Sequence, residues 1–272
     1  MLIAHSPNKL HTELDAMRFR GGTRRCVSLI TTRGDLHDGH GAVINAAKTV
    51  SDVVVVGIMP GQSHQKDNVI SNDEFKDIGF IERHKADVLY APPEESLGSS
   101  DHIELNFDST PVEFTLPQTL LTHYLKFLHA VQPDIMVWGE RNFVEYSQVR
   151  RMIRELGIRT QVQCIPTVRH ANGVAVSGDD DYFDEAQQEQ LPIIFETLRN
   201  AAHAIRAGAR NFSKVANTGK LAIKGAGFEL DYFHILDEEL LIPASNETTT
   251  YRIITRAQLG ERTIFDSIGL TL

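Results

Sequence analysis

Two histidines three residues apart are the part of this sequence with the clearest chemistry. An apolar run over Cys26–Thr31 leads through Thr32, Arg33, Gly34, Asp35 and Leu36 into His37-Asp38-Gly39-His40, where a helical pattern begins. In open α/β sheets, ligands lie at the carboxyl ends of strands, where helix N-termini point their N–H groups at anions. Imidazoles at such a place stabilise the charge that builds up on phosphoryl oxygens, and Gly39 allows close backbone approach. The motif predicts a phosphate site.

Two plainer interpretations compete with this one. A His-x-x-His sequence on a helix also occurs in zinc sites, but no third ligand follows at a convincing spacing, so we expect no metal site. Two exposed histidines at a helix start would also be unremarkable. The position of His37 and His40, after a buried strand and before a helix, favours the phosphate site over both.

Alternating strands and helices must position these histidines. The run Val53–Val56 is β-branched throughout, which is typical of a strand buried on both faces in a parallel sheet. We therefore expect an α/β fold with a doubly wound, Rossmann-like parallel sheet. Its strands are expected over 26–31, 52–58, 86–90, 134–138 and 159–165, and its helices from Pro7 after a Ser6 cap and over 40–50, 117–131 and 143–156.

The pattern changes after Gly173. A polar, acidic stretch over 177–185 precedes a long helix that runs through Arg206, and strand patterns follow over 228–236, 251–255 and 262–265. We expect a nucleotide-binding domain over residues 1–175 and a smaller α+β lid domain over 176–272.

Composition limits the classes of function. Net charge is −9, which argues against a nucleic-acid partner, and no apolar run approaches the roughly 20 residues of a membrane helix. Cys26 and Cys164 both lie in apolar runs and are expected to be core residues rather than a disulfide. A cytoplasmic location fits these features.

Motifs along nearly the whole chain resemble one family. His37-Asp38-Gly39-His40 resembles the His-x-Gly-His signature of nucleotidylyl transferases. The other motifs resemble those of the pantothenate synthetase family: Gln132-Pro133-Asp134, Trp138-Gly139-Glu140-Arg141-Asn142-Phe143, Arg150-Arg151-Met152, Pro166-Thr167-Val168-Arg169, Asn172-Gly173, Asp231-Tyr232 and Ala257-Gln258-Leu259-Gly260-Glu261-Arg262-Thr263.

The resemblance implies an ATP- and Mg²⁺-dependent ligase that usually acts as a homodimer. The family activates pantoate as an acyl adenylate, releasing pyrophosphate, and then joins it to β-alanine, releasing AMP. Carried over by position, the implied catalytic residues are His37, His40 and Arg141. The implied nucleotide-binding residues are Thr32, Gly39, Gly139, Asn142, Val168, Val176 and Ser177, and the implied acid-binding residues are Gln62, Glu145 and Arg33.

Some positions depart from the family pattern. Its Ser-Ser-Arg-Asn segment is Ser177-Gly178-Asp179-Asp180 here, so an acid replaces a cation. Unit charges about 4 Å apart interact by roughly 4 kcal/mol at an intermediate dielectric. Another cation therefore substitutes, or Asp179 holds magnesium, or this loop points elsewhere.

The expected acid pocket departs as well. Glu145 replaces a glutamine and Arg33 replaces a methionine. The two side chains either recognise a more polar acid than pantoate, or face solvent, or pair with each other.

The leading interpretation is an adenylate-forming ligase that joins pantoate or a related acid to β-alanine or a related amine. Nucleotidyl transfer to a different substrate is one alternative. A non-catalytic paralogue that binds nucleotide or another protein is the other, and the loss of the arginine at Asp179 motivates it.

Overall fold

The structure is a computed structural model and describes residues 1–59, 72–97, 105 and 116–272. These residues form two compact units. The first unit holds the described residues before Glu140 together with Gln148–Ile165, and the second holds Glu140–Ser147 and Pro166–Leu272. The expected domain boundary between residues 175 and 176 stays a prediction.

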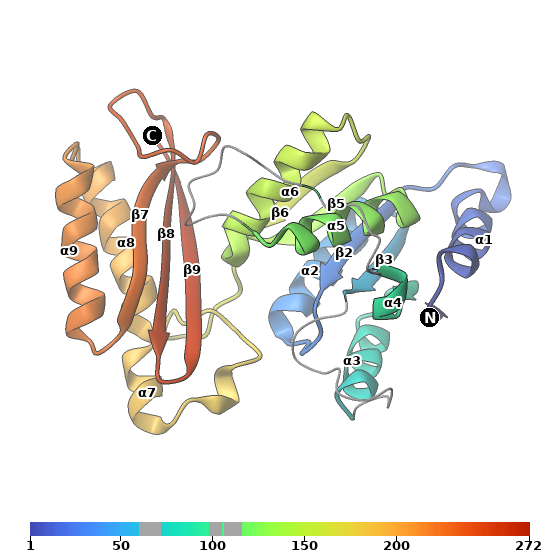
Figure 1. The fold of residues 1–272 in the computed structure, drawn as a ribbon, viewed down its shortest axis with the longest axis horizontal. Helices are drawn as coiled ribbons and strands as arrows, with labels where there is room; N and C mark the ends of the chain where they lie inside the picture. The colour runs from blue at the N-terminus through green and yellow to red at the C-terminus, as the bar shows by residue number, and fades with distance from the viewer. Residues whose placement is uncertain (60–71, 98–104, 106–115) are drawn as a thin grey trace. The chain divides into compact units, whose positions relative to one another are not determined.

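The first unit is built on a parallel sheet whose described strands number six. Their order is β1-β4-β3-β2-β5-β6, and every neighbouring pair is parallel. The bounds are β1 (Leu2–Ala4), β2 (Val27–Thr32), β3 (Val53–Ile58), β4 (Val88–Tyr90), β5 (Ile135–Gly139) and β6 (Gln161–Ile165) (Figure 1). The order reverses at β2, which pairs with β3 on one side and β5 on the other.

Helices cover both faces of this sheet, as the strand pattern requires. Val54 and Val56 lie in one cluster with residues of α2 and α3, whereas Gly57 faces Phe127 of α5 from the opposite face. Because successive strand residues point to opposite faces, this alternation requires a layer of helices on each side. The α-helices that the structure describes before β6 are α1 (Pro7–Arg18), α2 (Asp38–Val50), α3 (Asn72–Arg83), α4 (Glu94–Leu97), α5 (Gln118–Val131) and α6 (Phe143–Glu155).

Two local contacts fix helix ends in this unit. Ser6 caps α1 by accepting a hydrogen bond from the Lys9 N–H, with Pro7 at the first helical position, as the sequence predicts. Arg18, at the other end of α1, donates to the carbonyl oxygens of Val131 and Gln132 at distances of 2.9 and 3.1 Å. A cation at the end of α5 satisfies carbonyls that the helix leaves without partners.

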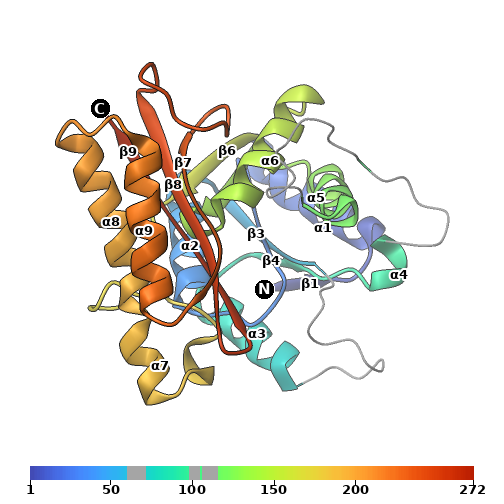
Figure 2. The ribbon, with the colours of Figure 1, turned by 60° about the vertical axis from the view of Figure 1, so that its left-hand side comes forward.

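The second unit is a three-stranded antiparallel sheet with helices packed on it. The strands β7 (Glu229–Asp237), β8 (Thr250–Leu259) and β9 (Arg262–Thr271) lie in chain order, and α8 (Pro192–Arg206) and α9 (Phe212–Gly225) lie side by side on one face (Figures 1 and 2). A short helix, α7 (Glu185–Gln190), precedes α8. With the parallel sheet, this unit confirms the expected fold class.

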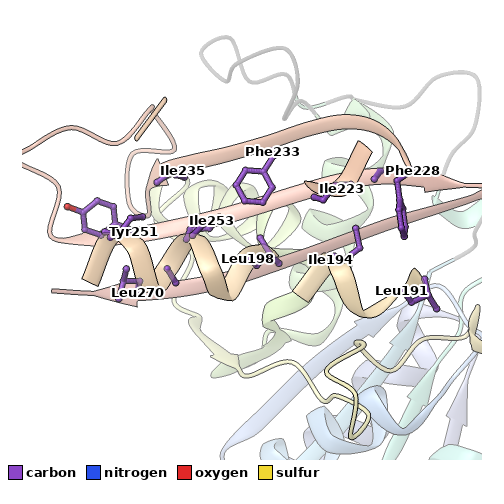
Figure 3. Packing of buried hydrophobic residues seen from close by; sticks show 14 of the residues in the cluster. Leu191, Ile194, Leu198, Ile223, Phe228, Phe233, Ile235, Tyr251, Ile253 and Leu270 are labelled. Atoms are coloured by element: carbon purple, nitrogen blue, oxygen red, sulfur yellow. The ribbon is translucent and has the colours of Figure 1, made fainter. Parts of the chain in front are cut away.

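The core of the second unit explains a glycine inside a helix. Phe233 of β7 is fully buried beside Ile253 and Leu198 (Figure 3). Its ring lies 2.8 Å from the place that a Cβ on Gly219 of α9 would occupy. Any side chain at position 219 would therefore displace either the helix or Phe233.

Some expectations were wrong in detail. Cys26 precedes β2 rather than lying in it, and both Cys26 and Cys164 are half-buried instead of core residues. The helix expected over 143–156 ends at Glu155, and Leu156 after it is 51% exposed. The short β1 and the helix α9 were not expected. No helix among the described residues is long and apolar enough to cross a membrane.

Candidate active site

The loop between β2 and α2 places the histidine motif at the reversal point of the parallel sheet. β2 ends at Thr32, and α2 begins at Asp38 with His37 as its N-cap residue. The first helical N–H groups therefore face the carboxyl end of the sheet, between the continuations of β3 and β5. Open α/β sheets bind ligands in this crevice, and a helix N-terminus there favours anions.

Hydrogen bonds define which ring nitrogens of the two histidines carry protons. His37 Nδ1 accepts from the Gly39 N–H at 3.1 Å, and His40 Nδ1 accepts from the His37 N–H at 3.3 Å. A nitrogen that accepts a hydrogen bond cannot carry the proton, so in each neutral ring the proton lies on Nε2. The ring centroids are 4.2 Å apart. The pair thus presents two Nε2–H donors from one turn of chain.

Thr32 joins the strand end to His40. Its hydroxyl is buried and lies 3.2 Å from His40 Nε2, and it also accepts from the Gly34 N–H at 3.3 Å. Any acceptor that bound His40 Nε2 would compete with Thr32 for this proton. The predicted nucleotide-binding residue Thr32 therefore lies in direct contact with the predicted catalytic residue His40.

Gly139 reaches the same edge of the sheet from β5. It is the last residue of that strand, paired with Ile165 of β6, and a Cβ at its position would lie 3.8 Å from Val43 of α2. That distance is an ordinary van der Waals contact, so protein packing alone does not require a glycine here. The structure brings Thr32, Gly39, His37, His40 and Gly139 together at one end of the first unit.

The other predicted nucleotide-binding residues belong to the second unit. Val168 and Val176 face each other across a short hairpin, in which the Val176 N–H donates to the Val168 carbonyl at 3.0 Å. Gly173 turns this hairpin with a φ of +90°, and a Cβ there would lie 2.7 Å from the Phe195 ring. The close approach to Phe195 explains why glycine follows Asn172.

Arg141 is bound to the backbone of the second unit. Its Nε donates to the Phe265 carbonyl at 3.2 Å, and its Nη1 donates to the Val176 carbonyl at 3.3 Å. Burial lowers the pKa of the guanidinium below its ordinary value, while the carboxylates of Asp266, Asp179 and Asp180 oppose that shift. Arginine has five N–H donors, so these two bonds leave donor capacity for an anion. The predicted phosphate ligand is thus also a structural cross-link.

Glu145 and Asn142 form one contact near the start of α6. The Asn142 amide donates to the Glu145 carboxylate, and the Glu145 side chain is almost fully buried. A buried carboxylate is costly unless hydrogen bonds or opposite charges compensate it. Of the other predicted acid-binding residues, Arg33 is exposed in the first unit, and Gln62 lies outside the described residues.

The two acidic side chains of the loop that departs from the family pattern are both hydrogen-bonded. Asp180 accepts from the Ser177 N–H at 3.1 Å and from His170 Nε2 at 2.8 Å. Asp179 accepts from Arg262 Nη1 at 3.1 Å, and the Arg262 guanidinium lies over the Tyr182 ring at 3.9 Å. Arg262 therefore pairs with the acid that stands in place of the family's arginine, and whether it substitutes for that arginine stays a prediction.

Sequence reasoning missed several residues that shape this region. Arg169 binds both carboxylate oxygens of Asp266, at 2.6 and 2.9 Å, and its guanidinium lies 3.8 Å from the centroid of the Phe195 ring. Arg252 lies between the carboxylates of Glu140 and Glu238. The sequence did contain a signal for the Arg169–Asp266 pair, because Asp266 is an acid in the middle of the mostly apolar run Ile264–Ile268. Among the described residues, no group of three or more histidine, cysteine or acidic side chains could hold a metal ion.

Comparison with known proteins agrees with this geometry. The family model described as pantoate-beta-alanine ligase matches residues 2–269. The pantothenate synthetase of Methylococcus capsulatus is 29% identical over 262 residues, covering 90% of this chain and 91% of that protein. The pantothenate synthetase of Marinobacter nauticus is 28% identical, with both chains covered completely.

Solved structures show the same fold. Pantothenate synthetase from Thermus thermophilus superimposes with a TM-score of 0.83 at 23% identity, covering 98% of this chain and 99% of that one. A pantoate-beta-alanine ligase from Francisella tularensis, solved in complex with beta-gamma ATP and beta-alanine, has a TM-score of 0.72 at 21% identity, covering 98% and 97%.

The fold and the site define a class: a doubly wound α/β protein with a histidine pair at the helix start where its parallel sheet reverses order. Within that class the matched family is specific, because its model covers nearly the whole chain. The chain belongs to the pantoate–β-alanine ligase family.

Proposed function

We propose that this chain is an ATP-dependent ligase that activates pantoate or a closely related acid and joins it to β-alanine or a related amine. The acid carboxylate attacks the α-phosphorus of ATP, and the acyl adenylate forms as pyrophosphate leaves. The amine then attacks the activated carbonyl, and AMP leaves with one carboxylate oxygen. The observation that carries the proposal is the pair of Nε2–H donors of His37 and His40 at the N-terminus of α2.

Residues at the end of β2 and the start of α2 are proposed to bind the phosphates. Charge accumulates on the phosphoryl oxygens as pyrophosphate departs, and fixed N–H donors stabilise that charge without reorganising. His37, His40 and the helix N–H groups near Gly39 are such donors. Thr32 holds His40 in place, and Gly139 offers its backbone to the nucleotide.

The family resemblance assigns the remaining contacts of the proposal. The backbone of Val168 and Val176 contacts adenine and ribose together with Asn142, and Arg141 and Ser177 contact phosphates. By the same resemblance, the residues proposed to bind the acid are Glu145, Gln62 and Arg33. Mg²⁺ enters with the triphosphate, since this cation is commonly held by substrate phosphates with few protein ligands.

The proposal extends to the setting of the protein. Its partners are small carboxylic acids and amines, with no nucleic acid and no membrane, and a second copy of the chain in a homodimer. A cytoplasmic location fits the family resemblance and the reduced state of the two cysteines, Cys26 and Cys164.

Pyrophosphate exchange tests the proposed function. Labelled pyrophosphate should enter ATP only when pantoate or another accepted acid is present, because the exchange reverses acyl-adenylate formation. Adding β-alanine should then produce an amide and AMP in equal amounts. Exchange without any acid would instead indicate nucleotidyl transfer to another group.

A non-catalytic paralogue is the second candidate. It is motivated by Asp179, which stands in the loop at the position where the family has an arginine. In this structure Asp179 accepts a hydrogen bond from Arg262. If no acid supports exchange while ATP still binds, this candidate replaces the ligase.

A further inference from the structure

A carboxylate from α3 contacts the turn that leads to the histidine pair. Asp77 Oδ1 accepts a hydrogen bond from the Leu36 N–H at 2.9 Å. The Asp77 side chain is only 6% exposed, although aspartate is seldom buried. The Leu36 N–H lies in the peptide that joins Asp35 and Leu36, so this bond fixes the peptide plane directly before the one that carries the His37 N–H.

The turn itself needs an external support. Gly34 and Asp35 both have positive φ angles, +94° and +53°. A left-handed conformation costs about 1–2 kcal/mol for a residue with a Cβ, although aspartate tolerates it better than most. A Cβ on Gly34 would lie 3.1 Å from Asp77 Oδ2, so the carboxylate packs directly against the turn. The hydrogen bond to Leu36 and the close approach to Gly34 therefore both place the Asp77 carboxylate against this turn.

The contact extends to the second histidine through one peptide. The His37 N–H is the group that donates to His40 Nδ1, and this bond keeps the His40 proton on Nε2. Rotation of the segment around Leu36 would turn the His37 N–H away from His40. The ring could then carry its proton on either nitrogen, or change its orientation.

We propose that Asp77 is a positioning residue that holds the His37 N–H toward His40 and so fixes the Nε2–H tautomer of His40. It touches no substrate and acts only through the turn. Leu36 is a second anchor, because its side chain packs against the core cluster that includes Val43 and Phe80. The inference rests on the proposed role of the two histidines at the phosphates.

Three variants separate positioning from plain stability. Asp77→Ala removes the acceptor for the Leu36 N–H, whereas Asp77→Asn keeps an oxygen in its place. Asp87→Ala is the matched control, because Asp87 Oδ2 accepts from the Val54 N–H at 2.9 Å, the same kind of bond away from the histidine turn. The readouts are acid-dependent pyrophosphate exchange, the melting temperature, and the ring ¹⁵N shifts of His40.

We expect Asp77→Ala to lower kcat for exchange at least about ten-fold with little change in KM for ATP, which corresponds to roughly 1.4 kcal/mol of barrier. Asp77→Asn should recover most of that loss. Asp87→Ala should lower the melting temperature and leave kcat unchanged. Wild-type kcat in Asp77→Ala, or an equal loss in Asp87→Ala, would overturn the assignment.

The ring ¹⁵N shifts of His40 test the positioning role of Asp77 even if the chain proves not to be a ligase. They report the His40 tautomer in the folded protein, without any turnover. If exchange is absent in the wild type, the proposed function fails. If the His40 shifts then change in Asp77→Ala and not in Asp87→Ala, the positioning role stands; if they stay the same, it falls too.

Discussion

Arg262 binds Asp179 with 3.1 Å between Nη1 and Oδ1, and the same guanidinium lies over the ring of Tyr182. The pair is half exposed on both sides, and ion pairs of this kind contribute at most about 1 kcal/mol to stability. The pair therefore matters more for local charge than for stability, because Arg262 offsets the negative charge of Asp179, which replaces an arginine of the family pattern.

Replacing Asp179 by asparagine should strengthen ATP binding. The substitution removes a negative charge and frees Arg262 to face the triphosphate, so we expect KM for ATP to fall about five-fold, equivalent to roughly 1 kcal/mol. Arg262→Ala should raise it by a similar factor. Arg256→Ala is the control, since Arg256 forms a comparable exposed pair with Asp231. Equal effects at positions 262 and 256 would show that Arg262 has no special role.

Replacing His40 by alanine should abolish turnover without unfolding the protein. Losing one preorganised donor to developing charge costs about 10²–10³ in kcat. Exchange kinetics with a thermal melt check this, and His203→Ala on the exposed side of α8 is the control. Full activity in His40→Ala would remove the pair from the site.

His37 needs a variant of its own, because it also caps α2. His37→Ala should cost about 1 kcal/mol of stability as well as activity. His37→Asn keeps a capping side chain, so a variant that is stable but inactive would isolate the loss of the imidazole. If His37→Asn is both stable and fully active, the imidazole has no part in the reaction.

Replacing Arg141 by alanine should weaken ATP binding and destabilise the second unit together, because two carbonyls lose their donor. Calorimetric titration with ATP below the melting temperature separates the two effects. Arg206→Ala, at the end of α8, is the surface control. Unchanged ATP affinity in folded Arg141→Ala would leave Arg141 with its structural role alone.

Asp134 should make stability depend on acid pH. Burial acts to raise the pKa of this carboxyl, but hydrogen bonds from the Val27 N–H and Arg24 outweigh it, and the pKa is lowered. A lowered pKa stabilises the folded state above the unfolded pKa of about 3.9, and that contribution is lost as pH falls through the folded value.

The measurement is urea unfolding of wild type and Asp134→Asn at pH 7 and near pH 3. At pH 7 the variant should be less stable by about 1–2 kcal/mol, and at pH 3 the difference should shrink. A difference that does not depend on pH would mean that the charge of Asp134 contributes nothing.

Glu145 should set the preference for the acid. Its buried carboxylate cannot donate to a substrate hydroxyl unless it is protonated, whereas a glutamine can. We expect Glu145→Gln to raise kcat/KM for pantoate about ten-fold and to lower it for acids that carry an amine. The exposed Glu155→Gln is the control. Efficient turnover of pantoate by the wild type, with no gain in the variant, would show that the substitution is tolerated.

Much of the first unit could be predicted from sequence because buried strands and helix starts have characteristic residue types. The run Val53–Val56 predicted β3, and the sequence from Cys26 to His40 predicted the strand, turn and helix of the site. Side chains that make long-range contacts gave weaker signals. Glycine is a poor helix former, yet α9 contains Gly219, because the Phe233 ring of β7 leaves no room for a side chain at that position.

The site was predictable at its histidines and unpredictable in its supports. A capping histidine follows from local spacing, whereas the Asp77–Leu36 bond joins residues 41 positions apart. The polar, acidic sequence of α3 gives no sign that Asp77 is buried. Likewise Arg262 and Asp179 are 83 positions apart, so no local pattern shows that one compensates the other.

The division of α6 between the two units limits how this protein can be recombined. Its first residues belong with Pro166–Leu272, and from Gln148 onward they belong with the parallel sheet. Arg252 of β8 depends on Glu140 and lies over Phe143, both encoded more than a hundred positions upstream. A chimaera that exchanges only a contiguous C-terminal segment with a relative would separate a buried arginine from its carboxylate. Exchange between family members therefore succeeds only if residues 140–147 are exchanged with that segment.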